Sequence, residues 1–86
     1  MTDELDATLI RLQFVAYNQR RTEPGVAEDL DVVIRLAQSN PTDRQIDPLV
    51  TARLEKRAAR ATQDNQPTLA KDLLAAVGLI RKLTAT

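Results

Sequence analysis

Apolar residues along this chain recur at intervals of three and four positions, the spacing of one face of an α-helix. Four segments carry the pattern, and Pro24, Pro48 and Pro67 fall where the later three begin, as prolines do at the first position of a helix. The pattern predicts helices over residues 3–20, 24–39, 48–64 and 67–83. The fold class is therefore all-α: a four-helix antiparallel up-down bundle that occupies residues 1–86 as a single domain.

The predicted helix over residues 67–83 is the most apolar of the four. One stripe runs along it, with further apolar side chains on both sides: Leu69, Leu73, Ala76, Ile80 and Leu83 form the stripe, and Val77 and Leu79 flank it. Because apolar positions cover more than half of its circumference, other helices must cover it from two directions. The chain itself or a second copy can supply them, so dimerisation is one way to complete the bundle. Gly78 predicts a close approach of another helix.

The first two predicted helices each carry a second apolar face. Two interpretations remain open. Either these side chains pack on a neighbouring helix of the same chain, or they form a surface that binds another protein. The second is favoured by the aromatic residues, since aromatic anchors dominate many interfaces. The predicted protein-binding residues are Ile10, Phe14 and Tyr17 of the first helix and Val32 and Leu36 of the second.

Four cationic residues lie along one side of the third predicted helix and are here called the basic ridge: Arg53, Lys56, Arg57 and Arg60. Net charge is zero, but residues 1–31 hold seven acids and three bases. The ridge is therefore interpreted as a solvated face partly neutralised by the acidic front half. Two alternatives are recognition of another protein and binding of nucleic acid, for which the ridge would contact phosphates.

The residue types that are missing exclude many kinds of chemistry. With no cysteine and no histidine, the chain cannot form disulfides, Cys or His metal sites, or nucleophiles activated by histidine. No phosphate-binding or dinucleotide-binding motif is present, so we predict no enzyme activity, no cofactor and no metal. No apolar run approaches the ~20 residues of a membrane span, and the acidic start differs from a signal peptide, so we expect no membrane contact and a cytoplasmic protein.

These observations favour a non-enzymatic protein–protein interaction module: an adaptor, assembly factor, inhibitor or chaperone-like small helical protein. It is expected to be a homodimer and to bind another protein through an apolar helical face. The alternative is a nucleic-acid-binding accessory or regulatory protein that uses the basic ridge.

Overall fold

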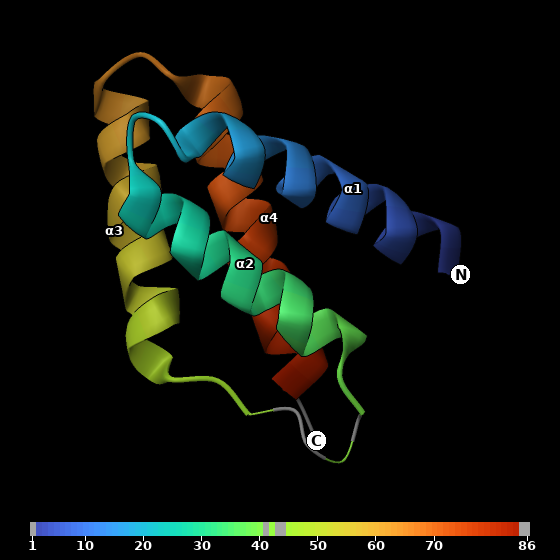
Figure 1. Cartoon of the computed structure of the whole chain (residues 1–86). Helices are drawn as coiled ribbons and strands as arrows, with labels where there is room; N and C mark the ends of the chain where they lie inside the picture. The colour runs from blue at the N-terminus through green and yellow to red at the C-terminus, as the bar shows by residue number, and fades with distance from the viewer. Residues whose placement is uncertain (1, 41, 43–44, 85–86) are drawn as a thin grey trace.

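The computed structural model describes residues 2–40, 42 and 45–84. Its four helices are α1 (Thr2–Gln19), α2 (Pro24–Gln38), α3 (Pro48–Gln63) and α4 (Pro67–Thr84). Consecutive helices run in opposite directions, as Figure 1 shows. The predicted all-α four-helix bundle is confirmed, and every predicted helix boundary lies within one residue of the observed one.

Local signals in the sequence set the ends of α3. The helix begins at Pro48, and the side chain of Asp47 caps it by accepting a hydrogen bond from the backbone N–H of Leu49 at 2.9 Å. Beyond its other end, Asn65 takes a left-handed conformation with φ of 65°, and the N–H of Gln66 donates to the carbonyl of Ala61 at 2.8 Å. This is a Schellman motif, which satisfies the last carbonyls of the helix and turns the chain toward α4.

The helices α2 and α4 form the centre of the bundle. Each of them packs against all three other helices, whereas α1 and α3 lie outside and barely touch each other. Four of their side chains are completely buried in the core between the helices: Leu30 and Val33 of α2, and Leu73 and Ala76 of α4. The expectation that α4 is covered from two directions is confirmed, and the cover comes from within the chain. Burial of the apolar stripe of α4 therefore requires no second copy.

The N-terminal half of α1 diverges from α4, and Figure 1 shows its N-terminus standing clear of the bundle. An open groove of about 550 Å³ lies between the two helices and is lined by Leu5, Thr8, Ala75 and Gly78, among others. A Cβ atom built on Gly78 would meet no heavy atom within 4 Å. The predicted close approach of another helix at Gly78 is therefore wrong within the described chain, because α1 diverges at this level.

None of the helices in the described part of the chain is both long enough and apolar enough to cross a membrane.

The open space beside Gly78 gives a stability prediction. Gly78→Ala should raise the free energy of unfolding by roughly 0.5–1 kcal/mol, because alanine is the better helix former and its methyl group meets no neighbour. Urea unfolding followed by circular dichroism measures the difference. A loss of stability would contradict the open groove, since it would require an atom packed against Gly78.

Candidate functional site

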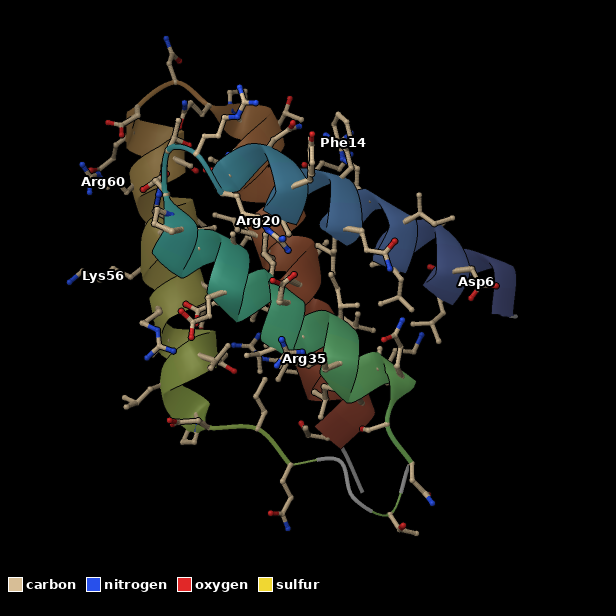
Figure 2. The ribbon with its side chains drawn as sticks, viewed as in Figure 1. Asp6, Phe14, Arg20, Arg35, Lys56 and Arg60 are labelled. Carbon is tan, nitrogen blue, oxygen red and sulfur yellow. The ribbon has the colours of Figure 1, made fainter. Side chains whose placement is uncertain are left out.

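Three large apolar side chains of α1 point away from the bundle. Ile10, Phe14 and Tyr17 are 66%, 54% and 71% exposed, and they are here called the outer face of α1. They lie on the opposite side of the helix from Leu12 and Ala16, which are buried in the core. Figure 2 shows Phe14 directed away from the other helices. The predicted apolar face of the first helix is therefore present and open to solvent.

The second apolar face predicted on α2 is not a separate surface. Leu36 is only 5% exposed and belongs to the core, and Val32 is partly buried against that core. The reason is the central position of α2, which contacts three helices and so buries a wider arc than one stripe. The five predicted protein-binding residues do not form one surface, because only Ile10, Phe14 and Tyr17 are free to meet a partner.

Arg11 connects the outer face of α1 to α4. Its guanidinium carbon lies 5.5 Å from the centre of the Phe14 ring, within the range of a cation–π interaction. The same guanidinium donates to the Asp72 carboxylate, with Nη2–Oδ2 at 2.9 Å and Nε–Oδ1 at 3.2 Å. This hydrogen-bonded ion pair raises the pKa of Arg11 above its ordinary value. Phe14 is thus held beside a cation that is itself fixed to the core.

A second ion pair repeats this arrangement on the other side of the bundle. Arg53 of α3 donates to Asp29 of α2, with Nη2–Oδ1 at 2.8 Å and Nε–Oδ2 at 3.0 Å. Asp29 and Asp72 are 7% and 9% exposed and are the buried charged residues of the described chain. Burial of a carboxylate costs free energy unless the group is paired with a cation and hydrogen-bonded. Each of these two carboxylates accepts hydrogen bonds from both Nε and Nη2 of one arginine.

The two ion pairs reveal an internal repeat that our sequence analysis missed. The α1–α2 hairpin and the α3–α4 hairpin share two sequence patterns. In the first helix of each hairpin, an Arg-Leu pair is followed by an alanine four residues after the leucine. The second helix of each hairpin begins with a proline and continues with an Ala-x-Asp-Leu run. Corresponding residues lie 42 positions apart in the first helices and 43 in the second: Arg11 and Arg53, Leu12 and Leu54, Ala16 and Ala58, Pro24 and Pro67, Ala27 and Ala70, Asp29 and Asp72, Leu30 and Leu73. The arginine of each hairpin binds the aspartate of the other, so the hairpins dock reciprocally.

The basic ridge is partly neutralised by acids from the front half of the chain. Besides Arg53, the guanidinium of Arg57 is engaged, because its Nε and Nη2 donate to the Glu23 carboxylate, with Nε–Oε1 at 2.8 Å. Arg60 lies 3.7 Å from Asp64 at the end of its own helix. In the part of the chain that the structure describes, Lys56 makes no ion pair and Nη1 of Arg57 is buried without a hydrogen-bond partner.

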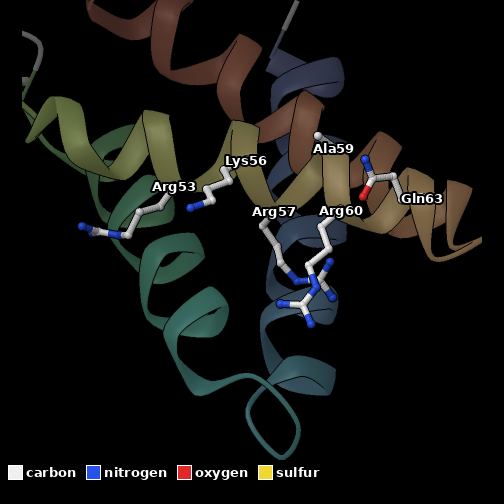
Figure 3. Close-up of a pocket in the computed structure, with 6 residues that line it drawn as sticks. All are labelled: Arg53, Lys56, Arg57, Ala59, Arg60 and Gln63. Carbon is white, nitrogen blue, oxygen red and sulfur yellow. The ribbon is translucent and has the colours of Figure 1, made fainter.

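A hollow of about 500 Å³ runs along the basic ridge. Figure 3 shows its lining, which projects from α3: Arg53, Lys56, Arg57, Ala59, Arg60 and Gln63. The ridge residues thus lie together along one side of α3, as predicted. The guanidinium groups of Arg53 and Arg57, however, already form ion pairs with carboxylates of α2 and of the turn before it. The cations left for an external anion are chiefly Lys56 and Arg60.

Comparison with known proteins adds no relative: no family model, no curated protein and no solved structure matches the chain. Within the described residues, no group of three or more carboxylates is arranged to hold a metal ion. A functional proposal must therefore start from the outer face of α1 and the basic ridge.

The reciprocal ion pairs give a paired stability prediction. Asp29→Asn and Asp72→Asn should each lower the free energy of unfolding by roughly 1–2 kcal/mol, because each leaves an arginine without its charged partner. This loss of stability is small for a buried ion pair, because the arginine side chain of each pair is about half exposed to solvent. Urea unfolding measures both variants. Asp31→Asn, in the more exposed pair with Arg20, is the control and should cost less than about 0.5 kcal/mol. Equal effects in all three variants would contradict a special role for the buried carboxylates.

Glu23 makes stability depend on pH. Hydrogen bonds from Arg57 hold the pKa of Glu23 below its ordinary value, helped by the charges of Arg57 and Arg60 and opposed by partial burial. A lowered folded-state pKa stabilises the fold above the unfolded pKa of about 4.3, and this contribution is lost as pH falls through the folded value. Glu23→Gln should therefore be less stable than the parent at pH 7, and the difference should shrink below about pH 4.

Thermal unfolding between pH 2 and pH 7 tests this dependence, with Glu4→Gln as the matched control on an exposed carboxylate. A difference between parent and Glu23→Gln that stays constant down to pH 2 would contradict it.

Proposed function

We propose that this protein is a non-enzymatic protein–protein interaction module, of the adaptor, assembly-factor, inhibitor or chaperone-like kind, whose contact surface is the outer face of α1. The observation that supports the proposal is the exposure of Ile10, Phe14 and Tyr17 side by side on a helix whose opposite side already closes the core. Full burial of an exposed large apolar side chain is worth roughly 1.5–3 kcal/mol, and a partner that covers these half-exposed to two-thirds-exposed side chains gains the corresponding fraction for each.

The internal repeat supplies a comparison within the same molecule. The positions in α3 that correspond to Ile10, Phe14 and Tyr17 are Ala52, Lys56 and Ala59, and these are also exposed. The same place in the fold is therefore compatible with small or charged side chains. Large apolar residues on α1 are not required by the packing of the hairpins, which supports a role in binding.

The surroundings of Phe14 also suit a binding surface. The ring is held beside Arg11, whose own position is fixed by Asp72 of α4. A side chain that is ordered before binding loses less conformational entropy when a partner covers it. Phe14 is therefore partly preorganised by its contact with Arg11.

Nucleic-acid binding by the basic ridge is the alternative proposal. It has less support, because Arg53 and Arg57 already bind Asp29 and Glu23. With Lys56 and Arg60 as the main phosphate contacts, the log–log dependence of affinity on salt would have a slope of only about −1.4 to −1.8.

Replacement of the two aromatic residues tests the proposal. Phe14→Ser with Tyr17→Ser should abolish capture of protein by the tagged chain while stability changes by less than about 1 kcal/mol, since both side chains are exposed. The measurement is a pull-down from the native extract with and without nuclease, read by mass spectrometry. The matched control is Leu49→Ser with Leu74→Ser, which removes two exposed leucines away from the outer face and should leave capture unchanged.

A captured protein that is retained by the aromatic variant would contradict the proposal. Loss of all captured material on nuclease treatment, together with loss of binding in Lys56→Ser with Arg60→Ser, would favour the basic ridge instead.

A further inference from the structure

We infer that the hollow along α3 is a binding site for one phosphate group, the dianion of a small phosphomonoester or inorganic phosphate itself, held by Lys56, Arg57 and Arg60. This inference goes beyond the proposed function, because the hollow lies on α3 and shares no residue with the outer face of α1. Three features of the described chain support it: the comparison of the two repeats, a buried donor without an acceptor, and the positive charge of the hollow.

The internal repeat indicates that the fold does not require arginines at this place. With the offset of 42 residues between the first helices of the hairpins, Arg57 corresponds to Val15, which is buried in the core. With the same offset, Arg60 corresponds to the neutral Asn18. The side chain of Arg57 is only 14% exposed. Burial of a guanidinium costs free energy that burial of a valine does not, so packing alone does not explain Arg57.

One hydrogen-bond donor of Arg57 has no acceptor. Its Nε and Nη2 donate to the Glu23 carboxylate, whereas Nη1 is buried without a hydrogen-bond partner among the described residues. A buried donor that lacks an acceptor costs free energy, and in folded proteins such a group is commonly satisfied by water or by a bound ion. Because Arg57 lines the hollow, an oxyanion bound there can supply the acceptor.

The hollow carries more positive than negative charge. The cations Lys56, Arg57 and Arg60 have two carboxylates near them, Glu23 and Asp64. Hydrogen bonds from Arg57 lower the pKa of Glu23 and the charge of Arg60 lowers it further, so both arginines lie near this carboxylate. Asp64 approaches Arg60 no closer than 3.7 Å, which is beyond hydrogen-bond distance, and Lys56 makes no ion pair within the described residues. The donors of Lys56 and Arg60 are therefore free for a ligand.

The placement of the donors suits one compact phosphate group. Lys56 and Arg60 are four residues apart and are neighbours on one side of α3, and Figure 3 shows Gln63 at the end of the hollow beyond Arg60. A phosphomonoester dianion presents three strong acceptor oxygens to such donors, whereas a carboxylate has two. An extended polyanion is less suited, because Arg53 at the other end of the hollow is bound to Asp29.

Titration of the isotope-labelled full chain with sodium phosphate, followed by NMR, tests the inference. At about pH 8 and at constant ionic strength, the amide signals of residues 53–63 should shift and saturate, with a dissociation constant of roughly 1 mM. Lys56→Gln should weaken binding roughly tenfold, because it removes one charge-assisted hydrogen bond. Lys71→Gln, which changes an exposed lysine of α4 outside the hollow, is the matched control and should leave binding unchanged.

A second variant removes the buried guanidinium with little risk to the fold. Arg57→Val with Glu23→Gln gives these two positions the residues that the other half of the repeat carries as Val15 and Gln66. The variant should therefore remain helical by circular dichroism, and it should bind phosphate at least about tenfold more weakly than the parent. Phe14→Ser with Tyr17→Ser should bind phosphate as the parent does, which keeps this test separate from that of the proposed function.

The source of the phosphate group is distinguished by three further ligands. Tighter binding of glycerol phosphate than of inorganic phosphate supports a small phosphomonoester, and the reverse order supports free phosphate. Dimethyl phosphate, a diester with a single charge, should bind more weakly than either. Absence of saturation with phosphate, or binding that is unchanged in both Lys56→Gln and the double variant, overturns the inference. Binding of a single-stranded oligonucleotide without binding of phosphate also overturns it and favours the nucleic-acid alternative.

Discussion

Two buried carboxylates constrain how this bundle can assemble. Asp29 and Asp72 lie in the central helices α2 and α4, where an unpaired charge would be costly. Each is paired with an arginine from the other hairpin, Arg53 or Arg11, and the two contacts are reciprocal. Docking of the hairpins in another register would break both of these contacts. The pairs therefore act together with the apolar core, which supplies attraction but little directional selectivity.

Most of the fold was predictable because its signals are local. Helix starts are marked by Pro24, Pro48 and Pro67, and the cap at Asp47 acts within two residues of the chain. The central position of α4 followed from its wide apolar arc. The groove beside Gly78 was not predictable, because it depends on the inclination of α1 relative to α4, and no local pattern encodes that angle.

The candidate site was predictable only in part. Ile10, Phe14 and Tyr17 lie opposite the core stripe of their own helix, so periodicity alone identifies them. Leu36 was misassigned because its burial depends on how many helices surround α2. The carboxylates that form ion pairs with Arg53 and Arg57 come from α2 and the turn before it, so residue spacing within α3 could not reveal them. The repeated Arg-Leu and Ala-x-Asp-Leu runs were the sequence signal for the internal repeat, and they indicate equivalent roles for Arg11 and Arg53 and for Asp29 and Asp72.

The core thus closes without the outer face of α1, and we propose that a partner protein binds this surface. Site-specific cross-linking in the native extract measures this contact most directly, because the chain has no cysteine of its own and a single introduced thiol can carry a photoactivated cross-linker at one position. Gln13→Cys places the cross-linker next to Phe14 on an exposed position of α1, whereas Lys56→Cys places it on the corresponding side of α3. A cross-linked partner protein at Gln13→Cys and none at Lys56→Cys is the predicted result. Equal cross-linking at both positions, or none at Gln13→Cys, would contradict it.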